Sequence, residues 1–170
     1  MKIAVLKETA PGETRVAASP ETVKKLAALG ASVAAEAGAG ALASISDGDF
    51  EAACAQVADR QSTIAGADLI LCVSGPAPGE LPGAASGAVL VGALDPLRRR
   101  DAIKHYASAG LEALAMEWMP RITRAQSMDI LSSQSNLAGY KAVVDAASIY
   151  GRAFPMMMTA AGTVSAARVF

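Results

Sequence analysis

Residues 120–140 read PRITRAQSMDILSSQSNLAGY and gather polar side chains in a chain otherwise rich in Ala, Val and Leu. Gln126, Asp129 and Ser132 are each three residues apart, so on helical backbone they would share one face. An amide and a carboxylate there can satisfy the donors and acceptors of a polar ligand. Arg121, just before them, can offer a rigid cationic fork to a phosphate group or to Asp129.

The same side chains also have an explanation that needs no ligand. Ser127 or Ser132 can cap a helix, and Asp129 is favourable near a helix N-terminus. Arg121 would then form a salt bridge. Both explanations can hold together, because a capping side chain can also face a ligand.

The composition of the chain narrows the class of protein and the partners that can be expected for it. The chain has 170 residues, 52% of them hydrophobic and 18% charged, which fits one folded domain. Its formal net charge is -1, and its one basic run, the three arginines at 98–100, is interpreted as a solvated helix start. Nucleic acid is therefore not an expected partner.

Metal binding and membrane insertion are not expected either. Cys54 and Cys72 have no partners at metal-ligand spacing and are predicted to be small core residues in a reducing compartment. No segment reaches the roughly 20 apolar residues of a membrane-spanning helix. The N-terminal MKIAVLKE is predicted to be a strand rather than a signal peptide, so a cytoplasmic location is expected.

Short apolar runs alternate with helical patterns along the first two thirds of the chain. The predicted strands cover residues 2–6, 32–35, 67–73, 88–94 and 111–116. The predicted helices cover residues 21–29, 47–58 and 97–109. This alternation predicts an α/β fold, a parallel sheet with helices on both faces.

The pattern changes after the polar stretch. Apolar residues at helical spacing predict a long helix over 136–150 that ends at Gly151. Residues 167–170 look like the first residues of another strand. The sequence therefore reads as the front part of something longer.

Two blocks of sequence resemble a known family. Residues 4–31, AVLKETAPGETRVAASPETVKKLAALGA, resemble the opening of the alanine dehydrogenase and nicotinamide nucleotide transhydrogenase family. Residues 117–143, EWMPRITRAQSMDILSSQSNLAGYKAV, with RAFPMMMTAAGTVSAARV after them, resemble within it the NAD(H)-binding domain I of the α subunit of proton-translocating transhydrogenases. The resemblance covers the whole chain and is weaker between residues 40 and 110.

The resemblance implies a division of the chain. Domain I of the family has two Rossmann-like subdomains joined by long helices. Residues 1–125 would be the first subdomain, 126–151 the nicotinamide loop and connecting helix, and 152–170 the start of a missing NAD-binding subdomain. The Gly-rich dinucleotide fingerprint would lie in that second subdomain, since AGAGALAS at 37–44 lacks the third glycine and is interpreted as a turn.

The resemblance also implies a site. Arg121, Gln126, Asp129 and Ser132 correspond to polar positions of the family's nicotinamide-contacting loop. NAD(H) would bind this subunit, and NADP(H) would bind a separate partner, domain III. A membrane domain II would couple hydride transfer to proton translocation, which would hold the chain at the membrane periphery. A homodimer is expected for the full-length subunit.

The two activities of the family need different chemistry. Amination by alanine dehydrogenase needs a proton donor and a cation for the substrate carboxylate. The family's Lys and His correspond here to Ser74 and Asp95, which suit neither task. Arg15, which binds substrate in the dehydrogenases, is present, but a loop salt bridge with Glu8 or Glu13 is the preferred interpretation.

Hydride transfer between two nicotinamides needs no acid or base, so transhydrogenation is preferred. The alternatives are an alanine dehydrogenase-like oxidoreductase and a catalytically silent fragment. This chain alone is expected to be inactive.

Overall fold

The computed structural model describes residues 1–77 and 79–168. Contacts divide the chain into two compact units, Met1–Met128 and a second unit that begins at Asp129. Within the described part of the chain, every helix is too short or too polar to traverse a lipid bilayer. The three segments expected from the sequence, 1–125, 126–151 and 152–170, stay predictions. They were defined by function, and a division of the chain by contacts does not test that.

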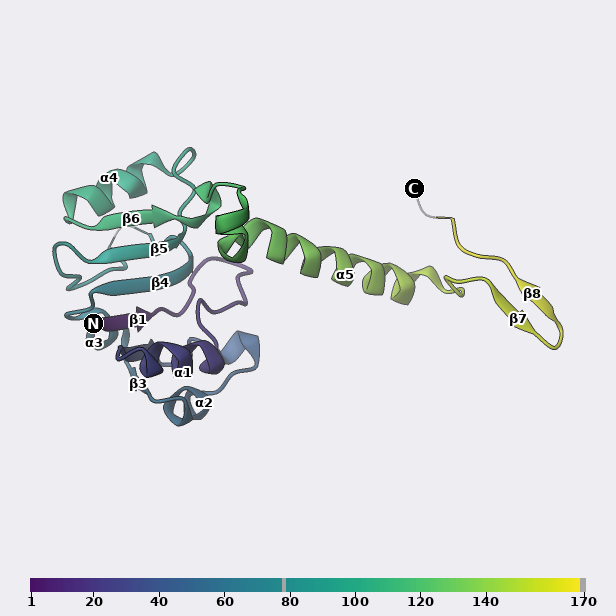
Figure 1. Cartoon of the computed structure of the whole chain (residues 1–170), viewed down its shortest axis with the longest axis horizontal. Helices are drawn as coiled ribbons and strands as arrows, with labels where there is room; N and C mark the ends of the chain where they lie inside the picture. The colour runs from purple at the N-terminus through teal and green to yellow at the C-terminus, as the bar shows by residue number, and fades with distance from the viewer. Residues whose placement is uncertain (78, 169–170) are drawn as a thin grey trace. The chain divides into compact units, whose positions relative to one another are not determined.

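The first unit is built on a six-stranded sheet in which every neighbouring pair is parallel. The strands are β1 (Lys2–Val5), β2 (Ser32–Glu36), β3 (Ala55–Ala58), β4 (Leu69–Ser74), β5 (Val89–Ala93) and β6 (Glu112–Ala115). Their order is β3-β2-β1-β4-β5-β6. Figure 1 shows β1, β4, β5 and β6 side by side. The chain runs outward from β1 and then returns to its other side, so β1 and β4 flank the switch point where open α/β sheets bind ligands.

Three of the helices of this unit start at side chains that accept free backbone amides. They are α1 (Pro20–Ala28), α2 (Asp47–Ala52), α3 (Arg60–Ile64) and α4 (Arg100–Ser108), with single-turn 3₁₀ segments η1 (Ala41–Ala43) and η2 (Met116–Trp118) and a longer one, η3 (Thr123–Met128). Ser19 caps α1, and Ser46 with Asp49 forms a capping box on α2. Asp59 caps α3 by accepting the amide of Ser62 at 3.0 Å.

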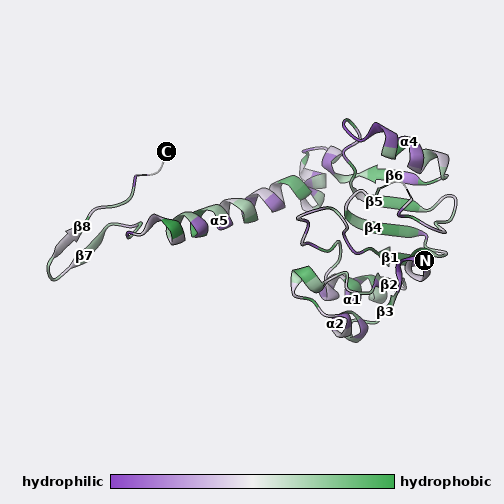
Figure 2. Cartoon of the chain, turned by 180° about the vertical axis from the view of Figure 1, so that it is seen from behind, coloured by the Kyte–Doolittle hydropathy of each residue, from purple (hydrophilic) through white to green (hydrophobic). Residues whose placement is uncertain are grey.

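The sheet is buried on both faces. Ile3 and Val5 pack with α1 and α2, whereas Ala4 and Leu6 pack with α3 and α4. The residues of β4 and β5 are mostly hydrophobic, whereas those of α4 are mostly hydrophilic, as Figure 2 shows. The expected α/β fold is therefore confirmed.

Several details of the first unit differ from the sequence prediction, among them the helix α3, which was not expected. The helix predicted over 47–58 stops at Ala52, because Cys54 adopts a left-handed backbone with φ of 70° and turns the chain. The residues after it form β3, a sixth strand that pairs with β2. Cys54 is exposed, so its predicted core position is wrong, whereas Cys72 is buried as expected.

The second unit contains one long helix and a hairpin. Helix α5 (Ile130–Tyr150) begins six residues before its predicted start at 136 and ends, as predicted, at Gly151, which has φ of 69°. An unpredicted antiparallel pair follows, β7 (Met157–Thr159) and β8 (Gly162–Val164). Residues 167 and 168 are not in a strand, and the rest of the strand predicted at 167–170 lies outside the described residues.

The close approach of β4 and β5 generates a stability prediction. A Cβ atom at Gly92 would lie 2.5 Å from the Cys72 sulfur and 2.6 Å from the Cys72 carbonyl oxygen. Gly92→Ala should therefore lower the free energy of unfolding by roughly 1–3 kcal/mol, the usual cost of overpacking. Denaturant titration would measure it, with Gly48→Ala in α2 as the control that has only ordinary contacts. Equal effects of the two substitutions would contradict this account.

Candidate functional site

The four predicted site residues fall on both sides of the boundary between the two units. Arg121 and Gln126 belong to the first unit, where both are exposed and Gln126 lies in η3. Asp129 and Ser132 open the second unit. Because Asp129 has an extended backbone, Gln126 and Ser132 do not share one continuous helix. The shared helical face expected from the spacing is therefore wrong.

Asp129 and Ser132 form the N-terminal cap of α5. One oxygen of the Asp129 carboxylate accepts the Ser132 amide at 3.0 Å, and the other accepts the Ser132 hydroxyl at 2.6 Å. A carboxylate at this position also complements the positive end of the helix dipole. The cap expected near this point is present, but the capping residue is Asp129 rather than Ser127 or Ser132. The Ser132 oxygen keeps lone pairs that can accept a further hydrogen bond.

The segment that carries Arg121 and Gln126 is a succession of tight turns. Backbone bonds join Met119 to Met116 at 3.1 Å, Ile122 to Pro120 at 2.9 Å, and Ala125 to Ile122 at 3.0 Å. Ala125 is 4% exposed, so the segment is packed against the rest of the unit at this residue. The polar residues therefore project from a folded loop.

A carboxylate ties the same segment to the end of β5. The two oxygens of Glu117 accept the backbone amides of Leu94, at 3.1 Å, and Asp95. Asp95 has φ of 48°, a left-handed conformation that Asp tolerates better than most residues. Glu117 thus supplies the acceptors that the last amides of this strand lack.

Glu8 supplies acceptors in the same way for the last amides of β4, the strand beside the switch point. Its carboxylate accepts the amides of Val73 at 2.6 Å and Ser74 at 3.0 Å. Burial raises the pKa of Glu8, and the two backbone hydrogen bonds oppose that rise. Neither Glu8 nor Glu117 was recognised from the sequence as a ligand of strand ends, because their partners are far away along the chain.

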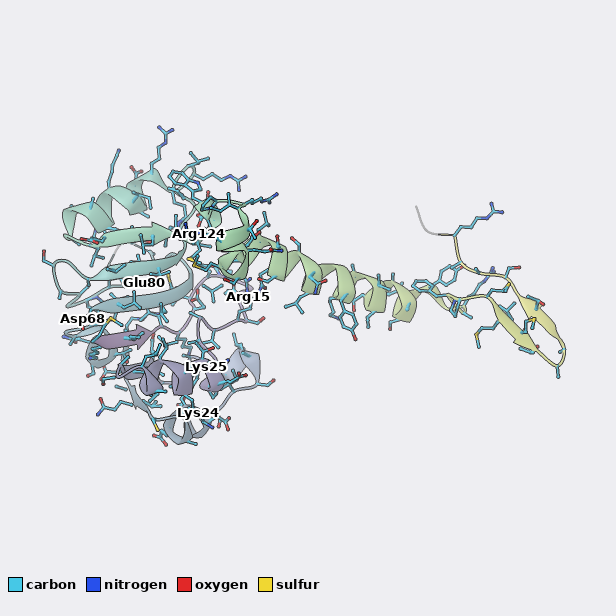
Figure 3. All side chains as sticks on the ribbon, viewed as in Figure 1. Arg15, Lys24, Lys25, Asp68, Glu80 and Arg124 are labelled. Atoms are coloured by element: carbon cyan, nitrogen blue, oxygen red, sulfur yellow. The ribbon has the colours of Figure 1, made fainter. Side chains whose placement is uncertain are left out.

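Arg15 forms the loop salt bridge expected from the sequence, with Glu13 as its partner. The guanidinium lies 2.6 Å from the Glu13 carboxylate and also donates to it through Nε at 2.8 Å. These hydrogen bonds lower the pKa of Glu13 to about 2. Arg15 and Arg124 of η3 lie near the carboxyl ends of the strands, which we call the carboxyl edge of the sheet. Asp68 lies at the amino ends of the strands, on the opposite side (Figure 3).

Ser74 and Asp95, the residues expected where alanine dehydrogenases carry Lys and His, lie at the ends of neighbouring strands. Ser74 is the last residue of β4, and Asp95 follows β5 closely. The strands pair through Ser74 and Ala93, so the parallel sheet brings these two positions to the same edge. That edge therefore carries a hydroxyl and a carboxylate at these positions.

Two arginines organise the loops around this edge. Arg60 donates to the Glu36 carboxylate at 3.1 Å, to the Lys7 carbonyl at 2.6 Å and to the Glu80 carbonyl at 3.1 Å. It thereby joins the loop after β1, the end of β2 and the loop after β4. Its partners are distant in sequence, so no local signal predicts this role.

Arg99 corrects the sequence interpretation of residues 98–100 as solvated. Its guanidinium donates to the carbonyls of Gly75 and, at 3.2 Å, Pro76, and the buried Tyr106 hydroxyl also donates to Pro76. The sequence spacing could have predicted that Arg99 faces the protein interior, since residues 99, 102 and 106 fall on one face of a helix. Ala102 and Tyr106 are the buried residues of α4.

Comparison with known proteins places the chain in a family. The profile described as "Alanine dehydrogenase/PNT, N-terminal domain" matches residues 4–138. The chain belongs to this family. The resemblance stated from the sequence is thereby confirmed.

Relatives within the alanine dehydrogenase/PNT family include transhydrogenase subunits. The chain is 52% identical over 175 residues to the first part of NAD(P) transhydrogenase subunit alpha from Rhodospirillum rubrum, covering 99% of this chain and 46% of that protein. The crystal structure of transhydrogenase from Sinorhizobium meliloti matches with 54% identity and a TM-score of 0.92, over 98% of this chain and 50% of that one. The chain thus spans about half the length of these relatives.

Alanine dehydrogenases are related as well. That of Halomonas elongata is 35% identical over 145 residues, which cover 84% of this chain and 38% of that protein. Both activities named in the family description are therefore represented among the relatives.

The Arg15–Glu13 pair predicts a pH effect. The folded-state pKa of Glu13 lies below its ordinary value of 4.5, so the pair's stabilisation is complete above about pH 4.5 and is lost as the pH falls toward 2. Arg15→Gln should raise the pKa of Glu13 toward 4.5 and flatten this pH dependence. Carboxyl NMR titration would measure the pKa. Lys25→Gln, which removes the exposed partner of Glu21, should leave the pKa of Glu13 unchanged.

The α5 cap makes a second prediction. Asp129→Ala should destabilise the first turn of α5 by about 1 kcal/mol, because the Ser132 amide loses its acceptor. Amide hydrogen exchange at Ser132 and Ser133 would report this as faster exchange. Asp129→Asn keeps an acceptor oxygen and should have a smaller effect, so equal losses in the two variants would argue against the cap.

Proposed function

We propose that this chain forms one wall of the NAD(H) site in the α subunit of an NAD(P) transhydrogenase. Hydride passes from NADH bound there to NADP⁺ on a partner domain, in a reaction coupled to proton translocation. The proposal is carried by one observation, the folded polar segment that contains Arg121 and Gln126. Glu117 holds this segment to the end of β5, and Ala125 is buried within it. The relatives of the chain include transhydrogenase α subunits.

The donor set fits a nicotinamide nucleotide. Gln126 offers an amide donor and acceptor for a carboxamide or a ribose hydroxyl. Ser132 donates its own proton to Asp129, so its oxygen is an acceptor for an N–H group. Arg121 presents a planar cationic fork to a pyrophosphate.

Transhydrogenation suits these residues better than amination. The hydride leaves one dihydronicotinamide with both electrons and joins the other ring, so no side chain must give or take a proton. The residues then have to orient the ring and exclude alternative poses. By contrast, Ser74 is a poor acid, Asp95 repels a substrate carboxylate, and Arg15 is paired with Glu13.

The remaining assignments are part of the same proposal. The segment 126–151 is the nicotinamide loop and connecting helix, and residues from 152 onward begin the second NAD-binding subdomain. The subunit is cytoplasmic and is held at the membrane by the NADP(H)-binding domain III and the membrane domain II. The full-length subunit is a homodimer.

The test compares matched arginine variants in the longer polypeptide that contains this chain. Arg121→Ala should weaken NADH binding at least about ten-fold, because a charge-assisted hydrogen bond contributes roughly 1.5–3 kcal/mol. Arg124→Ala removes the same charge three residues away and should leave the affinity nearly unchanged. NADH fluorescence gives both dissociation constants, and equal effects would reject the site.

The reaction itself needs a second measurement. With the NADP(H)-binding partner present, NADH should reduce thio-NADP⁺, and without it the polypeptide should not aminate pyruvate. Amination of pyruvate without the partner would favour the alanine dehydrogenase alternative. The 170-residue chain alone should bind NADH weakly, and tight binding by this chain would contradict the idea that the second subdomain supplies most of the contacts to the phosphates.

A further inference from the structure

Glu117 joins the polar loop to the sheet through both oxygens of one carboxylate. These oxygens accept two consecutive amides, those of Leu94 and Asp95, at the end of β5. The short helix η2, which contains Glu117, packs against β5. The contact is therefore bidentate, and it fixes the direction of the chain as well as its position.

The strand end that Glu117 holds is itself rigid. Leu94 is fully buried, and the Asp95 carbonyl accepts the amides of Arg98 at 3.1 Å and Arg99 at 2.8 Å. Arg99 in turn donates to the carbonyls of Gly75 and Pro76. Glu117 thus ties the loop to a hydrogen-bonded framework at the end of β5.

Glu117 is one of two anchors on this loop. The other is the buried Ala125, and the turns that run from Met116 to Ala125 connect the two. Arg121 lies between the anchors, and Gln126 follows the second directly. Without the first anchor, this hydrogen-bonded loop would be held at Ala125 alone.

We propose that Glu117 is a positioning residue for Arg121 and Gln126, and that it sets nucleotide affinity without touching the nucleotide. This inference rests on the proposed function. A carboxylate suits the role because both its oxygens accept hydrogen bonds. Glutamine has a single acceptor oxygen, and its amide group would face a backbone N–H, whereas aspartate keeps the charge but is one methylene shorter.

The first experiment tests the anchor without any nucleotide. In the isotope-labelled chain, Glu117→Gln should speed amide exchange at Leu94 and Asp95 and shift the resonances of Arg121 and Gln126. Glu112→Gln, which changes an exposed carboxylate on neighbouring β6, is the matched control and should leave these four signals unchanged. Unchanged exchange and resonances in Glu117→Gln would overturn the inference.

The second experiment is a double-mutant cycle on NADH affinity in the longer polypeptide. Glu117→Gln should weaken NADH binding by up to about ten-fold, because one backbone donor at the end of β5 is left without its acceptor. Combined with Gln126→Ala, the loss should be smaller than the product of the two single losses, because both act through Gln126. Glu117→Asp should restore part of the affinity.

The outcomes separate the inference from the proposed function. Unchanged affinity in Glu117→Gln, with weaker binding in Gln126→Ala, would show that Glu117 is merely structural and would overturn the positioning role. Affinity that is unchanged in Arg121→Ala and Gln126→Ala would reject the proposed site instead. In that case the shifted resonances would still support Glu117 as the anchor of the loop.

Discussion

Backbone amides at the carboxyl ends of parallel strands need acceptors that the sheet cannot supply. In this chain carboxylates from elsewhere meet that need, Glu8 at the end of β4 and Glu117 at the end of β5. Buried amides without partners are rare in folded proteins because they are costly. The loops that bring these carboxylates are therefore fixed in place by the same bonds that complete the sheet.

The contacts that hold the loops at the carboxyl ends of the strands also shift the pKa values of acids there. Glu8 is held where burial raises its pKa, whereas Glu13 is paired with Arg15 and has a pKa of about 2. The carboxyl ends of the strands are thus surrounded by acids and by arginines, and Arg15, Arg60 and Arg99 each donate hydrogen bonds within the chain there.

The sequence predicts much of this unit and misses what depends on distant partners. The apolar runs predict β1, β4 and β5 well, because buried parallel strands are nearly continuous in hydrophobicity. Strand β3 is missed because its residues, AQVA, continue an Ala-rich helical pattern, and only pairing with β2 selects the extended form. The cap by Asp129 is predictable because its partner Ser132 is local, whereas the contacts of Arg60 and Glu117 span 20 residues or more.

The order of the strands has a consequence for synthesis of the chain. Of the six strands of this sheet, β1 is made first, and it lies inside the sheet between β2 and β4. One of its edges is paired once β2 emerges, but the other stays open until the ribosome has added α2, β3, α3 and β4. An open apolar edge is a template for pairing with other chains. Between the synthesis of β2 and that of β4, the central strand β1 therefore presents an unpaired edge that the finished sheet buries.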